Sequence, residues 1–317
     1  MTPARPASLA HATVAFLSME IAVETGMHSY SGGLGVLAGD YALAAADLGL
    51  PIVFISMVCR EGYVRQEIDA DGWQHHEKDP WDPADWATPL PVVPTVAIEG
   101  RQVRIRSWLR ELTGARGRKV SVPVLDTDVD ENDPEDRGIT GRLYGGDLRT
   151  RLRQEAGLGL GGKAVLDALG LDVAKYHLNE GHAALLPLAL LAEGVDRDDI
   201  RAASIFTTHT PIPAGHDRFP MDLVRSVLGE RLADVAARLF DGSTELDMTR
   251  LALELSDWVN GVSERHAEVS RQMFPGHVVH AVTNGVHLGR WTHPAFATLF
   301  DAVAPDWQER PSGLAGF

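Results

Sequence analysis

The chain has 317 residues, of which 44% are hydrophobic, so it can bury the core of one large or two ordinary domains. Its formal net charge is −15, from 44 acidic and 29 basic residues, which argues against nucleic-acid or anionic-membrane partners because both need a basic surface. The single cysteine, Cys59, excludes an internal disulfide and reads as a core residue in a reducing compartment. No segment approaches 18 uninterrupted apolar residues, and we expect a soluble, cytoplasmic protein.

The first strongly patterned stretch is a strand, a glycine loop and a helix. Residues 14–19 are apolar and predict a buried strand that delivers Glu20. The loop Ser31-Gly32-Gly33-Leu34-Gly35 follows, and an Ala- and Leu-rich helix closes at residues 49–51. Amides at a helix start that no side chain covers form, with the helix dipole, a site for an anion such as phosphate. The same glycines also suit an ordinary strand-to-helix turn.

The segment of about 60–145 reads as a small β-containing insertion, entered from a second buried strand at 52–58. Residues 71–94 carry three tryptophans and five prolines and predict an ordered loop or extension without a regular element. Strands that pair with each other are expected at 102–109 and 119–125.

An acidic run begins with Asp126, Asp128 and Asp130, which resembles the start of a calcium loop. The register fails, because Glu131 stands where such a loop needs glycine and Arg137 where it needs glutamate. We therefore expect carboxylates that are solvated or paired with arginine.

Residues 150–170 have the composition of a helix and contain Gly157, Gly159 and Gly162, which match the spacing of a dinucleotide fingerprint. No strand precedes them, so we interpret the glycines as a close helix-packing face.

The rest of the chain alternates short strands with helices, which predicts an α/β fold with a doubly wound, mainly parallel sheet. Strands are expected at 175–178, 203–208 and 277–283, and helices at 182–193, 221–240 and 249–274. We find no repeat or linker and treat 1–317 as a single domain.

Polar residues follow four of these strands, where ligands bind in a doubly wound sheet. They are Glu20 with the glycine loop, Asn179 with Glu180 and His182, His209 with Thr210, and Asn284 with His287. Such groups form hydrogen bonds with hydroxyls, so a carbohydrate is the expected ligand. We expect Gly33, His209 and Asn284 to line one pocket that holds it. Asn284 also fits a plain turn, and His209 also fits a satisfied core histidine.

The residues His177, Glu180 and His182 come nearest to a metal-ligand pattern. Alternation along the strand directs His177 away from the other two and no third spacing follows, so no metal site is predicted. Acyl-enzyme chemistry has no support, because there is no G-x-S-x-G motif and Cys59 follows an apolar run.

Eight ordered segments between residues 14 and 291 resemble the N-terminal half of the glycogen and α-glucan phosphorylase family, especially its shorter bacterial members. They read FLSMEIAVE, YSGGLGVLAGD, DLGLPIVFISMVCREGYVRQ, DENDPEDRGITGRLYGGD, RLRQE, HLNEGHAALLPL, FTTHTPIPAGHDRF and VTNGVHLGRW. The resemblance implies a Rossmann-like N-terminal half of a GT-B glycosyltransferase fold. It also implies cleavage of an α-1,4-glucan end by inorganic phosphate to give glucose 1-phosphate, with pyridoxal phosphate as cofactor.

By the same resemblance, Gly32, Gly33 and Leu34 would form the loop whose amides face the phosphate of substrate or cofactor. His209 would be the catalytic residue, with its backbone carbonyl at the reacting centre. Carbonyl and phosphate would stabilise an oxocarbenium-like transition state electrostatically.

The other residues carried over are substrate contacts. Asn284 would meet the sugar's hydroxymethyl group, and Glu20 and Glu180 would support the site.

The chain departs from the family in its lysines, Lys78, Lys119, Lys163 and Lys175, none of which lies in the Gly-Thr-x-Asn-Met-Lys motif that carries the cofactor. That motif belongs to a C-terminal domain that we do not find, so no attachment lysine is assigned. We expect a truncated protein, an excised domain or half of a split enzyme, with a C-terminal polypeptide or a second copy covering an exposed apolar patch.

Two alternatives remain. A glucan synthase would also end its first strand in such a glycine loop, although Tyr30-Ser31 replaces the usual Lys-Thr. A non-catalytic glucan-binding or assembly module would keep the sugar-binding face and do no chemistry.

Overall fold

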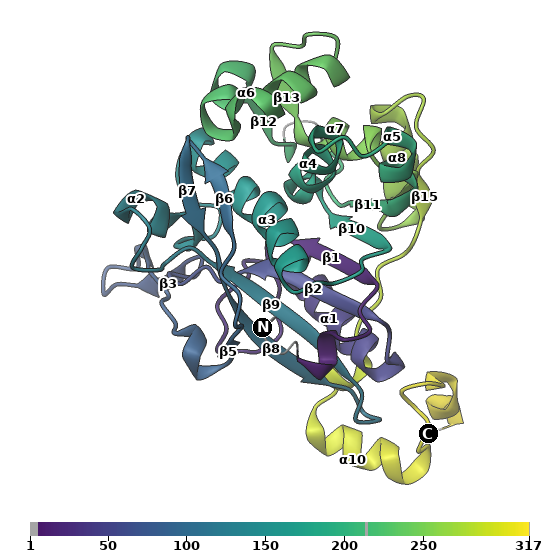
Figure 1. Ribbon diagram of the computed structural model, residues 1–317. Coiled ribbons are helices and arrows are strands. Elements are labelled where there is room, and N and C mark those ends of the chain that lie inside the picture. The colour runs from purple at the N-terminus through teal and green to yellow at the C-terminus, as the bar shows by residue number, and fades with distance from the viewer. Residues whose placement is uncertain (1–5, 213–214, 317) are drawn as a thin grey trace.

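The computed structural model describes residues 6–212 and 215–316 and is organised around one large sheet (Figure 1). The strand order is β15-β14-β11-β10-β1-β2-β9-β8-β5. Neighbours from β15 to β9 run parallel, whereas β8 and β5 are antiparallel to their neighbours. The predicted α/β fold with a mainly parallel sheet is confirmed in this coarse sense. The strands are β1 (Val14–Ser18), β2 (Ile52–Met57), β5 (Thr88–Pro89), β8 (Arg106–Thr113), β9 (Lys119–Asp126), β10 (Lys175–Asn179), β11 (Ser204–Thr208), β14 (Trp258–Gly261) and β15 (His280–Ala281).

The described residues form ten α-helices. They are α1 (Gly33–Leu48), α2 (Pro134–Arg137), α3 (Leu148–Ala168), α4 (Leu185–Ala192), α5 (Arg197–Ala203), α6 (Met221–Leu239), α7 (Met248–Glu254), α8 (Glu264–Met273), α9 (Leu288–Trp291) and α10 (Pro294–Val303). Three small antiparallel pairs complete the fold: β3 (Arg65–Ile68) with β4 (Gln74–Glu77), β6 (Thr95–Ile98) with β7 (Arg101–Arg104), and β12 (Arg218–Pro220) with β13 (Glu245–Asp247).

The two faces of the sheet bury separate cores, because side chains alternate along β1. Phe16 points to one face and packs in a cluster with Ala38 and Ala42 of α1. Leu17 points to the other face, where it meets Gly162 of α3. Helices α1 and α3 therefore cover opposite faces.

The order of the strands reverses beside β1. The chain leaves β1 towards β2 on one side and later returns to β10 on the other, so the topological switch point lies between β1 and β10. In open α/β sheets the crevice beyond the carboxyl ends of the strands at this point is where ligands bind.

Most elements predicted in the first half and the middle of the chain are confirmed. Helix α1 begins at Gly33, within the glycine loop, and ends at Leu48, followed by Gly49 in the left-handed conformation. The glycines of α3 pack closely as expected: a Cβ at Gly159 would lie 3.0 Å from Leu185 and Leu186 of α4. Cys59 is fully buried.

The acidic loop is paired with arginine, as one of the two predicted arrangements requires. Arg60 donates to Asp126 at 2.6 Å, and Arg137 donates to Asp128 at 2.6 Å and lies 3.3 Å from Asp130.

Several predicted boundaries are wrong. The single helix expected at 249–274 is α7, strand β14 and α8, and the strand expected at 277–283 is reduced to β15. The strand expected at 102–109 is divided between β7 and β8, and only β8 pairs with β9. Residues 71–94 were expected to lack regular elements, yet they contain β4, β5 and the 3-10 helix η2 (Pro83–Asp85).

The segment 60–145, predicted as an insertion, contains two small hairpins but also β5, β8 and β9 of the main sheet. The domain division therefore remains a prediction. Among the described residues, no helix is long and apolar enough to span a membrane.

Candidate functional site

The first part of the candidate site is a buried carboxylate that holds the glycine loop in place. Glu20 follows β1 and accepts hydrogen bonds from the backbone amides of Ser31 at 2.6 Å and Gly32 at 3.2 Å. Tyr144 donates its hydroxyl to the same carboxylate at 2.8 Å. The amide of Gly32 is therefore used inside the protein rather than offered to a ligand.

The next two amides lie at the start of α1. The described residues give the backbone N–H groups of Gly33 and Leu34 no acceptor, as expected for the first turn of a helix. A Cβ at Gly33 would meet nothing within 4 Å, so open space lies beside it, whereas a Cβ at Gly35 would lie 2.8 Å from Glu20 and 2.6 Å from Tyr30. Gly35 lets Glu20 approach the helix, and Gly33 leaves room for an anion.

The second part of the site is Glu180, which follows β10. Its backbone has φ 70° and ψ 171°, a conformation that residues other than glycine rarely adopt. Its carboxylate accepts hydrogen bonds from the amides of His209 at 2.8 Å and Thr210 at 3.1 Å, and from the Thr210 hydroxyl at 3.1 Å. Burial raises the pKa of Glu180, and these donors oppose that rise.

A buried chain of hydrogen bonds joins the two parts. His209 Nε2 lies 2.7 Å from Asn179 Oδ1, the Asn179 amide donates to Ser18 Oγ at 3.0 Å, and Ser18 donates to the carbonyl of Glu20 at 2.7 Å. Because the amide oxygen can only accept, the His209 proton resides on Nε2. Burial lowers the pKa of His209 to about 4, so the ring is neutral near pH 7.

Asn284 lies apart from this network. Its backbone amide donates to the carbonyl of Val262, just beyond β14, and its side chain is exposed. The structure thus brings together Glu20 with Gly32 and Glu180 with His209, and links these two pairs, but it gives Asn284 no direct contact with them.

Behind the glycine loop lies a buried polar cluster that the sequence did not indicate as one unit. Arg151 donates to His182 Nε2 at 3.0 Å and to Asp217 at 2.9 Å, and its guanidinium lies 4.4 Å from the centre of the Tyr144 ring. Burial lowers the pKa of His182 to about 3, so this ring is neutral. Burial and the neighbouring Asp217 hold the pKa of Glu155 well above its usual range. Through Tyr144 this cluster supports Glu20.

His177 belongs to a different buried row. It lies 2.8 Å from Thr207 Oγ1, which in turn donates to Asn260 at 3.0 Å. Within 6–212 and 215–316, no group of three or more side chains is placed to hold a metal ion.

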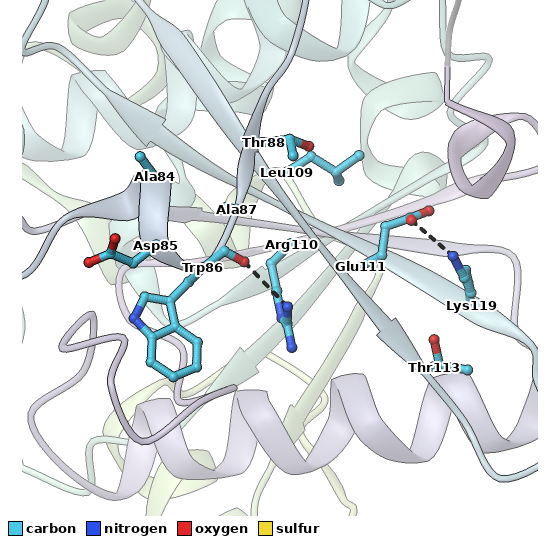
Figure 2. Close-up of a pocket in the computed structure, with 10 residues that line it drawn as sticks. All are labelled: Ala84, Asp85, Trp86, Ala87, Thr88, Leu109, Arg110, Glu111, Thr113 and Lys119. Atoms are coloured by element: carbon cyan, nitrogen blue, oxygen red, sulfur yellow. Dashed lines mark hydrogen bonds and ion pairs between the residues drawn. The ribbon is translucent and has the colours of Figure 1, made fainter.

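Three cavities lined by the described residues lie elsewhere. One of about 370 Å³ runs along β8, where Figure 2 shows Arg110 beside Trp86 and Glu111 facing Lys119. A second, of about 760 Å³, is lined by α1 and the segment around His287, and a third, of about 720 Å³, lies near Pro51. None of these three is lined by Gly33, His209 or Asn284, so the shared pocket predicted for them remains a prediction.

The lysines do not fit covalent attachment of pyridoxal phosphate at this site. Lys78 pairs with Glu61 and Lys119 with Glu111, while Lys163 pairs with Asp167 and Glu193. Lys175 donates to the backbone carbonyl of Ala202. Each lysine therefore has its partner among residues outside the glycine loop.

Sequence reasoning missed the residues that connect the site. Asn179 appears only as a polar residue after a strand, although its side chain joins His209 to β1. Tyr144 lies within a segment that carries the phosphorylase resemblance, which was the available signal, but nothing local predicts its bond to Glu20.

Fold and site together define an α/β protein with its polar loops gathered at a topological switch point. No family model matches the chain. Over 96% of its length it is 36% identical to a glycogen phosphorylase of Mycobacterium tuberculosis, of which it covers 38%. It is 36% identical to a maltodextrin phosphorylase of Thermococcus litoralis (91% of this chain, 37% of the relative) and 33% identical to a glycogen phosphorylase of Aquifex aeolicus (91% and 45%).

These relatives confirm the resemblance to the phosphorylase family: the chain is homologous to glycogen and maltodextrin phosphorylases over nearly its whole length. It spans less than half the length of these relatives.

Proposed function

We propose that this chain is the N-terminal, glucan- and phosphate-binding part of an α-glucan phosphorylase with the GT-B fold. One observation carries the proposal: the ends of β1, β10 and β11 are joined by hydrogen bonds at the switch point. Glu20 and Glu180 each hold a loop there, and Asn179 links the two, beside helix-start amides that have no acceptor among the described residues. The relatives named glycogen and maltodextrin phosphorylase support this substrate class.

The proposed phosphate contacts are the amides of Gly33 and Leu34. They lie at the positive end of the 16-residue helix α1, where an anion is stabilised without any basic side chain. That suits a chain of net charge −15 that must still bind phosphate.

The proposed sugar contacts are the backbone carbonyl of His209 and the side chain of Asn284. Glu180 fixes the backbone of His209 by accepting its amide hydrogen, so the carbonyl is held in one orientation. A dipole fixed in this way can stabilise positive charge that develops on a glucosyl unit, without reorganising during the reaction.

The complete reaction, in which phosphate cleaves the glucan end to give glucose 1-phosphate, needs a second polypeptide part in this proposal. The resemblance implies pyridoxal phosphate as the cofactor of that reaction, and no residue of this chain is assigned to it. Apolar side chains are exposed along the segment that a partner could cover, among them Val286, Trp291 and Phe296.

Calorimetric titration tests the binding part of the proposal. We expect glucose 1-phosphate to bind, and Gly33→Ala to weaken binding about tenfold, because the added methyl enters the space beside the loop amides. Gly138→Ala is the matched control, since a Cβ there also meets open space and Gly138 is an exposed residue directly after α2 rather than part of the loop before α1. Equal affinity in all three proteins would contradict the proposed phosphate site.

The same titration separates the alternatives. Binding of ADP-glucose without glucose 1-phosphate would indicate a glucan synthase. Binding of maltoheptaose, with no phosphorolysis even when the remaining part of a phosphorylase is added as a separate polypeptide, would indicate a non-catalytic glucan-binding module. Restored phosphorolysis in that mixture is the result that the proposal expects.

A further inference from the structure

Helix α1 carries a buried carboxylate that the proposed site does not use. Asp40 lies two turns after Gly33 and is only 3% exposed. Its oxygens accept three hydrogen bonds: from the His287 amide at 3.1 Å, Arg290 Nη1 at 3.1 Å and the Trp291 indole at 2.8 Å. A buried carboxylate with three donors is a specific anchor, because removing its charge leaves those donors without an equal partner.

All three donors come from one short segment, 287–291, about 250 positions along the chain. We call the contact between Asp40 and residues 287–291 the Asp40 clasp. His287 makes a second contact with the same helix: its Nε2 donates to Asp47, which lies further along α1 than Asp40, at 2.8 Å. The segment is therefore attached to α1 at two points.

The clasp reaches the glycine loop as well. Arg290 Nη1 also donates to the carbonyl of Ala22 at 2.8 Å, and the Ala22 amide donates to the carbonyl of Gly35 at 2.9 Å. A Cβ at Gly39 would lie 1.8 Å from the Ala22 oxygen and 2.8 Å from Arg290, so glycine is needed for this approach. Arg290 thus contacts Asp40 and the loop that follows β1 at the same time.

Asn284 lies three residues before the clasp. On its other side its backbone is tied to the end of β14, through the amide bond to Val262. Residues 284–287 therefore cross from β14 to α1 between two fixed points, although the Asn284 side chain itself is exposed.

We propose that Asp40 is a positioning residue that sets where Asn284 stands relative to the amides of Gly33 and Leu34. A sugar phosphate that contacts both needs this separation to be constant, since a displacement of about 1 Å can abolish a productive geometry. The inference rests on the proposed function, because it assigns Asn284 and the loop amides to one ligand.

The test compares Asp40→Asn with the unaltered chain in two measurements. In hydrogen exchange, we expect the amides of residues 285–291 to exchange at least about tenfold faster, with β1 and β10 unchanged, because only the clasp is loosened. In calorimetric titration, we expect the affinity for glucose 1-phosphate to fall about tenfold. Asp47→Asn is the matched control on the same helix: it leaves the three Asp40 bonds in place and should change the affinity less than about threefold.

Trp291→Phe provides a second variant in case Asp40→Asn does not fold. It removes one donor to Asp40 from a ring that is 58% exposed, so it should raise exchange in 285–291 without unfolding the chain. In the double variant Asp40→Asn with Trp291→Phe, the loss of affinity should be no larger than in Asp40→Asn alone, since the Trp291 indole donates to Asp40 and both changes therefore break the same contact.

Unchanged exchange in 285–291 would overturn the clasp, and faster exchange with unaltered affinity would overturn its positioning role. Failure of the unaltered chain to bind glucose 1-phosphate would instead overturn the proposed function, and the role of Asp40 in binding with it. The exchange measurement would then still show whether Asp40 holds the segment.

Discussion

At the scale of single residues, two glutamates perform the same task on neighbouring strands. The Glu20 carboxylate accepts hydrogen bonds from backbone amides of the loop after β1, and the Glu180 carboxylate accepts them from backbone amides of the loop after β11. Each carboxylate is buried and replaces water as the acceptor for backbone groups that no secondary structure satisfies. The loops are therefore ordered before any ligand arrives, which is the condition for a preorganised site.

Substitution by alanine should destabilise the protein at one glycine of the loop and have little effect at another. Gly35→Ala should lower the free energy of unfolding by about 2 kcal/mol or more, because the new methyl would collide with Glu20 and Tyr30. Gly33→Ala, which meets open space, should change it by less than about 0.5 kcal/mol. Denaturant unfolding measures both, and equal losses in the two variants would contradict the assigned geometry.

The strained backbone at Glu180 yields a second prediction. Glu180→Ala and Glu180→Gly both remove the carboxylate, but only glycine accepts φ 70° and ψ 171° without strain. The glycine variant should therefore be the more stable of the two by about 1 kcal/mol, reversing the usual preference for alanine. A more stable alanine variant in thermal unfolding would show that the residue relaxes instead of storing strain.

Individual site residues differ in how far the sequence predicts them. Strand ends are visible in the apolar pattern, so the polar residues after β1, β10 and β11 could be selected before the structure was known. Their partners could not, because the bond between Tyr144 and Glu20 joins positions 124 residues apart. Pairing over such separations depends on tertiary packing rather than local pattern.

At the scale of elements, the main error concerns 249–274. The stretch contains leucine, alanine and glutamate with no proline, which favours a helix. Strand β14 nevertheless interrupts it, because Val259 and Asn260 occupy a buried place in the sheet beside β11. A four-residue strand gives too little period-2 pattern to outweigh its helical neighbours, whereas the longer β9 was predicted to within one residue.

Close packing of α3 against α4 gives a prediction at this scale. Gly159→Ala should destabilise the protein by about 1–2 kcal/mol, because the methyl would lie 3.0 Å from the backbone of Leu186, which cannot yield as a side-chain tip can. Gly157→Ala on the same helix is the matched control: its nearest neighbour would be Ile139 at 3.6 Å, an ordinary contact. There the higher helix propensity of alanine should leave stability unchanged or raised by up to about 1 kcal/mol. Equal destabilisation of the two variants in urea unfolding would contradict the packing role of Gly159.

At the scale of the whole molecule, polar groups are distributed unevenly. Two half-buried histidines with lowered pKa values, His177 and His209, lie on and directly after central strands of the sheet, whereas exposed apolar side chains gather towards the C-terminal end, where α10 has no buried residue and lies at the lower edge in Figure 1. The first arrangement makes the free energy of unfolding depend on pH, and the second leaves apolar surface exposed to solvent.

The pH dependence follows from His177. Burial lowers its pKa to about 4, while the same group in the unfolded chain titrates near 6.5. Below about pH 6.5 the unfolded chain binds a proton that the folded protein does not, so the free energy of unfolding falls until the folded group also titrates near pH 4. The full loss from this one residue is about 3 kcal/mol.

Other groups titrate in the same window, so the prediction is made as a difference between proteins. Burial also lowers the pKa of His209 to about 4, which acts in the same direction, whereas the raised pKa values of Glu155 and Glu180 add stability as the pH falls. The free energy of unfolding of the unaltered chain minus that of His177→Gln should therefore fall by about 3 kcal/mol between pH 7 and pH 4. Urea unfolding at each pH measures this difference. If this difference did not change with pH, the His177 imidazole would have to be hydrated in the folded protein.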